Sequence, residues 1–335
     1  MRFIETIYEK LRERPRRVVF SEGDEPRVVA AAAEYVQRGL GPAIIVSSRE
    51  QAEGAAKAAS VSLEKIQILD PATDAAMPDF CRQLETFNYY RHISEPEARR
   101  VLINPNYFGT MLLLAGKADA LVGGAVSASG SILRPLFQMI RPRAGVKSIS
   151  SAMVVQVPNS SYGDEGLFIF ADCGVIPRPN IDQLASIAVE AARLARQLSA
   201  RPPRVAMLSY STRGSALTED TEKIVEATDL ARARFKDQDI DAEIDGELQV
   251  DAALVPEVAA IKTPNSPVAG RANVLIFPDL NSGNISLKLV QRLAGAEAYG
   301  QVLLGLAKPA ADLSRGATVP EILGTAALVG LQAEG

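Results

Sequence analysis

A hydroxyl, a guanidinium and a carboxylate lie close together near the C-terminal end of the chain. Ser314 and Arg315 are adjacent, a glycine follows them, and Glu321 comes six residues after the arginine. A hydroxyl can donate to an oxyanion, a guanidinium can bind phosphate through two parallel hydrogen bonds, and a carboxylate can accept a proton. These three groups together suit the transfer of an acyl group to or from phosphate.

The same residues also fit a structural interpretation. Thr318 followed three residues later by Glu321 matches a capping box, which commonly begins a helix, and we expect that helix over 319–329. The pattern alone leaves open whether Glu321 is a base or a cap.

Two further segments carry small polar residues that suit contacts to phosphate. The Gly-rich stretch 123–130 could hold phosphate through its backbone N–H groups, although it matches neither GxGxxG nor GxxxxGK[ST]. Close packing at a strand end explains the same small residues equally well. The second segment precedes an expected helix over 285–293, and it could bind an anion there or form an ordinary turn and cap. The candidate residues in the two segments are Ser127, Ser129, Asn281, Ser282, Gly283 and Asn284.

Short apolar runs alternate with longer helical patterns along the chain. Repeated strand–helix units predict an α/β fold with mostly parallel sheets that helices cover on both faces. The length of 335 residues suits two domains of roughly 150 residues each. The expected strands include 17–20, 43–46, 118–122, 204–208 and 273–277.

Composition excludes several classes of function. The 36 Lys and Arg residues against 40 Asp and Glu give a net charge of −4, which disfavours nucleic-acid binding. Two distant cysteines, Cys81 and Cys173, do not predict a disulfide framework or a zinc site, and the carboxylates of 245–251 have no His or Cys nearby. We therefore expect no metal. No apolar run reaches roughly 18 residues and no signal peptide is evident, so we expect no membrane span and a cytoplasmic location.

The chain resembles the phosphate acetyltransferases (phosphotransacetylases) of the phosphate acetyl/butyryltransferase family over nearly its whole length. The resemblance implies two αβα domains of the isocitrate/isopropylmalate dehydrogenase-like fold, with the active site in the cleft between them. The implied domains are 1–149 together with 297–335, and 150–296. The motifs that carry this resemblance are Lys308-Pro-Ala-Ala-Asp-Leu-Ser-Arg-Gly316, 271–284, Asp172-Cys173, 245–249 and 208–212.

The same resemblance implies an activity and roles for residues. The reaction is the reversible exchange of acetyl-CoA and phosphate with CoA and acetyl phosphate, by direct attack of the CoA thiol. Ser314, Arg315 and Glu321 are the implied catalytic residues, and Arg91 and Arg134 match arginines that hold phosphate groups. CoA is a substrate, no cofactor is permanently bound, and the enzyme is expected to be a homodimer.

Departures from the family pattern leave the acyl preference open. Ala311 stands where Asn is usual, Ala317 where Cys is usual, and Glu321 where Asp is usual. The alternatives are a phosphate acyltransferase for propionyl or butyryl groups and a non-catalytic acetyl-CoA-binding regulatory module. A dehydrogenase of similar fold is a further alternative, but its paired-aspartate metal pattern is missing from this sequence.

Overall fold

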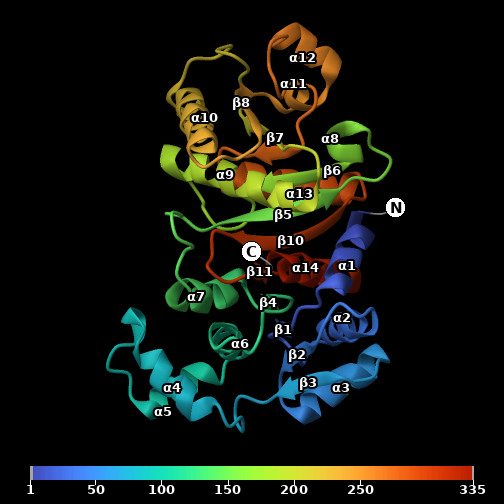
Figure 1. Cartoon of the computed structure of the whole chain (residues 1–335), viewed down its shortest axis with the longest axis vertical. Coiled ribbons are helices and arrows are strands. Elements are labelled where there is room, and N and C mark those ends of the chain that lie inside the picture. Colours follow the sequence, from blue (N-terminus) through green and yellow to red (C-terminus); the bar gives the residue numbers. More distant parts are fainter. Residues whose placement is uncertain (1–2, 334–335) are drawn as a thin grey trace. The chain divides into compact units, whose positions relative to one another are not determined.

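The computed structural model describes residues 3–333, which form two compact units. The first unit contains the chain up to Arg143, Tyr299–Val302 and the chain from Leu306 onward; the second contains Ala144–Ala298 and Leu303–Gly305. The N-terminal helix α1 and the C-terminal helix α14, blue and red in Figure 1, therefore belong to one unit.

The first unit alternates parallel strands with helices. Its strand order is β3-β2-β1-β4-β11-β10; the pairs from β3 to β11 are parallel, and β10 is antiparallel to β11. The division between the units falls within β10 (Glu297–Leu304). Its other elements are α1 (Phe3–Glu13), β1 (Val18–Phe20), α2 (Pro26–Gln37), β2 (Ala43–Val46), α3 (Arg49–Ala59), β3 (Ile66–Leu69), α4 (Met77–Glu85), the 3₁₀ helix η1 (Asn88–Tyr90), α5 (Glu95–Leu102), α6 (Pro105–Leu114), β4 (Ala120–Gly123), α7 (Ser129–Met139), β11 (Ala310–Asp312) and α14 (Val319–Gln332).

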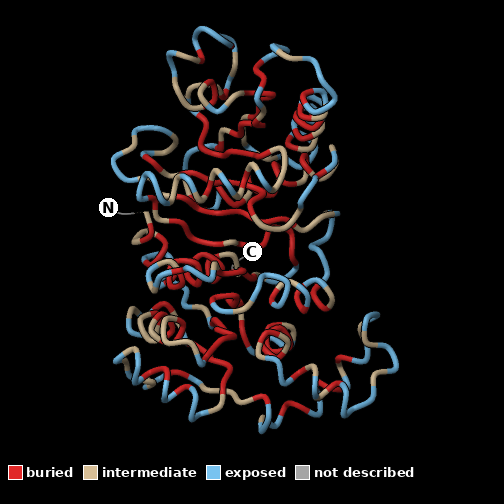
Figure 2. The backbone as a smooth tube through the Cα atoms, turned by 180° about the vertical axis from the view of Figure 1, so that it is seen from behind, coloured by how far each residue is buried: buried red, intermediate tan, exposed pale blue. Residues whose placement is uncertain are grey.

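The strands of this unit form its core. Every residue of β1, β2 and β4 is buried, as expected for short parallel strands that are covered on both faces (Figure 2). Helices α2 and α14 pack against each other, and α6 packs against β1 and β4. Helix α2 begins with Pro26 in its first turn, and Gly39 follows it with a φ of +72°, a conformation that favours glycine.

The second unit has the strand order β5-β6-β9-β7-β8. β5 and β6 are antiparallel, and the remaining neighbours are parallel. Helix α9 packs against α10, β6 and β9, while a buried apolar cluster that includes Phe170, Leu275 and Leu287 forms part of the core. The elements are β5 (Ser150–Gln156), α8 (Tyr162–Glu165), β6 (Leu167–Ala171), α9 (Ile181–Leu198), β7 (Arg204–Leu208), α10 (Glu219–Asp237), β8 (Glu243–Leu248), α11 (Val250–Leu254), α12 (Pro256–Lys262), β9 (Val274–Ile276) and α13 (Leu280–Leu293).

These elements confirm the predicted α/β class with mostly parallel strands. One predicted boundary was wrong: α13 begins at Leu280 and not at 285. Asp279 is its N-cap and accepts a hydrogen bond of 2.8 Å from the Ser282 backbone N–H, which lets the helix begin earlier. The functional domain boundaries at 149/150 and 296/297 stay a prediction. Within residues 3–333, no helix combines the length and apolar character needed to cross a bilayer.

Candidate active site

The loops that follow β4 and β11 lie side by side in the first unit. Asp312 is the register partner of Gly123, and the Leu313 backbone N–H donates to the Gly123 carbonyl at 2.6 Å. Because parallel strands place their carboxyl ends at the same edge, this pairing brings together the loops 124–128 and 313–318. Ligands of open α/β sheets commonly bind at such an edge.

The loop 313–318 presents the predicted hydroxyl and guanidinium. The Ala317 N–H donates to the Ser314 carbonyl at 2.9 Å, and the Gly316 N–H lies 3.4 Å from the Ser314 Oγ. Ser314 is half-buried in the resulting turn, whereas Arg315 is exposed. An anion can therefore reach the Arg315 guanidinium from solvent.

Glu321 lies in the first turn of α14, directly after this loop. Its Oε2 accepts hydrogen bonds from the Thr318 backbone N–H at 2.8 Å and from the Thr318 hydroxyl at 3.0 Å. The Glu321 N–H completes the capping box by donating to the Thr318 Oγ1 at 3.4 Å. The predicted cap is confirmed, so a role for Glu321 as a base has to be compatible with capping.

The Gly-rich segment after β4 binds a carboxylate of the protein itself. Buried Glu22, in the loop after β1, accepts hydrogen bonds from the backbone N–H groups of Ala125 at 2.5 Å and Ser127 at 2.9 Å, and from the Ser127 hydroxyl. The Val126 N–H points to the same carboxylate at 3.3 Å. The N–H groups that could have held phosphate are thus used by Glu22, because a buried charge requires donors around it.

Helix α7 starts immediately after this segment and lacks a side-chain cap. Its N-cap residue is Ala128, which has no acceptor group, and Ser129 in the first turn is exposed. Unpaired N–H groups and the helix dipole at such a start attract anions. The start of α7, with the Ser129 hydroxyl, is therefore the part of this segment that remains open to phosphate.

A second buried carboxylate, Asp312, lies under the same loops. It is 1% exposed, and neither of its oxygens has a hydrogen-bond partner within residues 3–333. Burial raises the pKa of Asp312 from 3.8 to about 6; the nearby Ser129 hydroxyl opposes the shift, and the Glu22 charge adds to it. Gly124 is required beside it, because a Cβ there would collide with the carboxylate and because its φ is +99°.

Arg91 and Arg134 lie on two segments that are joined by a cluster of hydroxyl and amide groups. Arg91 follows η1, Arg134 is on α7, and both are exposed. The Tyr90 hydroxyl donates to Gln138 of α7 and lies 3.1 Å from the Tyr107 hydroxyl. Burial raises the pKa of Tyr90, while the positive charge of Arg134 acts in the opposite direction.

The four remaining candidates, Asn281–Asn284, lie in the first turn of α13 in the second unit. The Ser282 backbone N–H and hydroxyl both donate to the Asp279 carboxylate, at 2.8 and 3.0 Å. The Asn284 amide donates to the Cys173 carbonyl at 3.2 Å, while Asn281 is exposed. The Ser282 N–H and hydroxyl at this helix start therefore bind a carboxylate of the protein, as in an ordinary cap.

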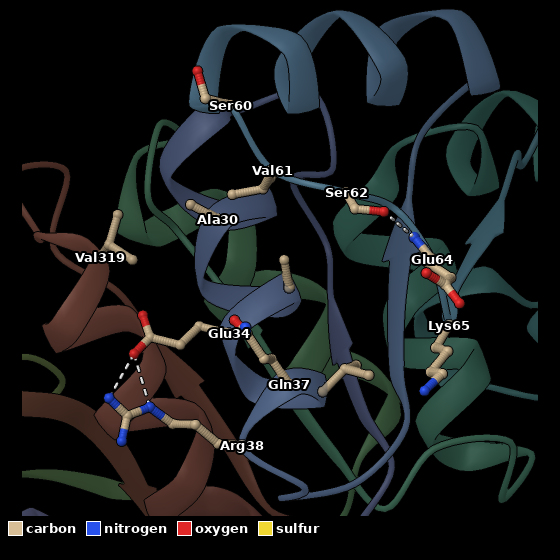
Figure 3. Close-up of a pocket in the computed structure, with 12 residues that line it drawn as sticks. Ala30, Glu34, Gln37, Arg38, Ser60, Val61, Ser62, Glu64, Lys65 and Val319 are labelled. Atoms are coloured by element: carbon tan, nitrogen blue, oxygen red, sulfur yellow. Dashed lines mark hydrogen bonds and ion pairs between the residues drawn. The ribbon is translucent and has the colours of Figure 1, made fainter.

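A separate groove lies on the first unit between α2 and the loop after α3 (Figure 3). None of the predicted site residues lines it, and its volume is about 810 Å³. Within residues 3–333, no group of three or more His, Cys, Asp or Glu side chains is placed to hold a metal ion.

Sequence reasoning missed Glu22, Arg27 and Asp312. Glu22 lies in the loop after β1, Arg27 lies in the first turn of α2, and Asp312 is the last residue of β11. For Glu22 and Asp312, the available signal was a charged residue at the carboxyl end of a buried strand, which in a parallel sheet lies at the ligand-binding edge.

Comparison with known proteins identifies the family. Residues 2–329 match the model of the family described as Phosphate acetyl/butaryl transferase. The chain belongs to this family. A phosphate acetyltransferase from Thermoanaerobacterium thermosaccharolyticum is 42% identical over 334 residues, which cover 100% of both chains. The predicted resemblance to the phosphate acetyl/butyryltransferase family is confirmed.

Solved structures extend this comparison to the fold. The EutD phosphotransacetylase from Staphylococcus aureus matches with a TM-score of 0.87 and 35% identity, covering 99% of this chain and 98% of that one. A 4-hydroxythreonine-4-phosphate dehydrogenase from Klebsiella pneumoniae matches with a TM-score of 0.53 over 96% of this chain and 98% of its own, at 14% identity. The second likeness concerns the fold alone, and it agrees with the predicted dehydrogenase-like architecture.

Proposed function

We propose that the protein is a phosphate acetyltransferase, which exchanges acetyl-CoA and phosphate reversibly with CoA and acetyl phosphate. Membership of the family supports this activity. The observation that carries it is the register of β11 with β4, which sets Ser314 and Arg315 beside the uncapped start of α7. That edge offers a hydroxyl, an exposed guanidinium and a helix start, which are three kinds of group that bind phosphoryl oxygens.

The proposed binding roles follow from exposure. Arg315 holds the phosphoryl group, while Arg134 and Arg91 hold phosphate groups of acetyl phosphate or CoA. Ser129 adds a hydroxyl at the start of α7, and Ser127, in contact with Glu22, supports that turn. In the second unit, we propose a substrate contact from the first turn of α13, Asn281–Asn284, of which Asn281 is exposed.

The proposed chemical step is direct transfer. The CoA sulfur attacks the carbonyl carbon of acetyl phosphate, the new C–S bond forms, and the C–O bond to phosphate breaks. Glu321 takes the thiol proton as sulfur attacks, Ser314 donates to the developing negative charge, and Arg315 neutralises the departing phosphate.

The cysteines support a route without an acyl-enzyme intermediate. Cys81 and Cys173 are free and buried, and burial raises the pKa of both thiols. A nucleophilic cysteine needs the opposite environment, one that favours the thiolate. Acetyl transfer through an enzyme thiol is therefore disfavoured at both positions.

The proposal extends to cofactor, location and assembly. CoA acts as a substrate and no cofactor is permanently bound. A cytoplasmic location suits a CoA-dependent reaction and two cysteines that stay free. We also propose a homodimer, since α13 exposes an apolar stripe at intervals of four residues: Ile285 (57% exposed), Leu289 (52%) and Leu293 (83%).

One assay tests the proposed activity and its alternatives. Thioester formation from CoA is measured with acetyl, propionyl and butyryl phosphate at matched concentrations. We expect the highest kcat/KM with acetyl phosphate. Higher values with butyryl phosphate would favour a longer-chain acyltransferase, and the absence of turnover with all three, together with measurable CoA binding, would favour a regulatory module.

A further inference from the structure

Arg27, in the first turn of α2, joins both loops of the candidate site. Its Nη1 donates to the carbonyls of Arg315 at 3.0 Å and Ala317 at 2.8 Å. Its Nη2 donates to the Ala125 carbonyl at 3.1 Å. One planar group thus binds the carbonyls of Arg315 and Ala317 on one loop and the Gly-rich segment on the other.

The guanidinium is itself held in place by Glu25. The Arg27 Nε donates to the Glu25 Oε1 at 2.7 Å, and the Arg27 backbone N–H lies 3.2 Å from the same oxygen. The Arg27 guanidinium lowers the pKa of Glu25, so this carboxylate is ionised at neutral pH. Pro26 lies between the two residues and restricts the backbone.

The contacts of Arg27 argue against a direct role in binding phosphate. A guanidinium has five N–H donors, and four of them are directed at protein acceptors. Arg315 differs, because its side chain is exposed at the outer surface of the loop. The two arginines therefore suit different tasks: Arg27 binds the loop, and Arg315 can bind the substrate.

We infer that Arg27 is a positioning residue, which together with Glu25 fixes the loop of Ser314 and Arg315 against the start of α7. The inference rests on the proposed function for its effect on turnover. A displacement of about 1 Å in a reacting group can cost on the order of 100-fold in rate. The loop 313–318 is irregular backbone, so its position depends on contacts of this kind.

Arg27→Lys is the informative substitution. Lysine keeps the charge but offers one ammonium in place of a planar fork, and it cannot reach Glu25 and three carbonyls together. Arg38 provides a matched control on the same helix (Figure 3). Both arginines pair with a glutamate at 2.7 Å, and their side chains are 33% and 34% exposed.

Two measurements on Arg27→Lys and Arg38→Lys test the inference. Backbone hydrogen–deuterium exchange of the peptide that covers 312–319 should accelerate at least tenfold in Arg27→Lys and stay unchanged in Arg38→Lys. In the acetyl phosphate and CoA assay, kcat should fall about 10- to 100-fold in Arg27→Lys alone, with the KM for CoA changed less than threefold. Thermal unfolding checks that both variants are folded.

Equal exchange rates in the two variants would overturn the inference, and so would faster exchange without a loss of kcat. If Arg27 had only a structural role, both substitutions would change the unfolding temperature equally, and Arg27→Lys would show no selective loss of kcat. If the wild-type protein itself does not turn over, the proposed function fails, while the exchange measurement still decides whether Arg27 holds the loop.

Discussion

Glu321 caps α14 and is the proposed base, and substitutions can separate these two roles. Glutamine also completes a capping box, so Glu321→Gln should keep the helix start of α14 and the unfolding temperature. It cannot accept the thiol proton, and we expect kcat to fall on the order of 10²- to 10⁴-fold, with little change in substrate KM. Steady-state kinetics between pH 6 and 9, alongside thermal unfolding, measure both effects.

Thr318→Ala is the complementary control, because it removes the cap and keeps the carboxylate. We expect it to cost about 1 kcal/mol of stability and less than a tenfold loss of kcat. Equal turnover of Glu321→Gln and the wild type would leave Glu321 as a capping residue only.

Asp312 makes the stability of the protein depend on pH. Its pKa is about 6 in the folded protein against 3.8 ordinarily, so between these values the native state binds more protons than the unfolded state. Stability should therefore fall as pH rises from about 4 to about 6, by at most about 3 kcal/mol for a shift of this size. Asp312→Asn removes that penalty, and its unfolding midpoint in urea should exceed that of the wild type at pH 8 but not at pH 4. A lower midpoint at pH 8 would show that the ionised carboxylate stabilises the fold.

At the scale of elements, a hydrogen bond ties η1 to α7. The Tyr90 hydroxyl donates to Gln138, Arg91 directly follows η1, and Arg134 is on α7, so we expect this contact to position the two arginines relative to each other. Tyr90→Phe removes the hydrogen bond, which typically contributes about 1 kcal/mol. We expect the KM for CoA or acetyl phosphate to rise several-fold with a smaller change in kcat. Tyr89→Phe is the matched control, since Tyr89 is 71% exposed; a similar rise in that variant would contradict the positioning role of Tyr90.

At the scale of the whole molecule, the apolar stripe on α13 predicts self-association. Leu289→Glu places a charge in the centre of the stripe, and burying it unpaired in an interface is unfavourable. We expect the wild type to sediment as a dimer and Leu289→Glu to sediment largely as a monomer in analytical ultracentrifugation. Ile261→Glu, on α12 at a position 84% exposed, should leave the dimer intact. A wild-type monomer would contradict the homodimer, and a Leu289→Glu dimer would place the interface elsewhere.

Local features and the family could be predicted from the sequence alone. The strands at 43–46 and 204–208 follow from apolar runs, and the cap formed by Thr318 and Glu321 depends on residues three positions apart. Such features are set by neighbours along the chain, so periodicity and spacing suffice to predict them. The motif around Ser314 and Arg315 predicted the family, and the match to the family model confirmed this prediction.

Only the tertiary structure decided which groups meet at the site. Glu22 lies 103 positions from the Ala125 N–H that it binds, and Arg27 lies 288 positions from the Arg315 carbonyl. The sequence pattern does not predict these contacts, because they depend on the strand order and on the register of β11 against β4. For the same reason, the sequence could not predict that Glu22, after β1, binds the N–H groups of the Gly-rich segment.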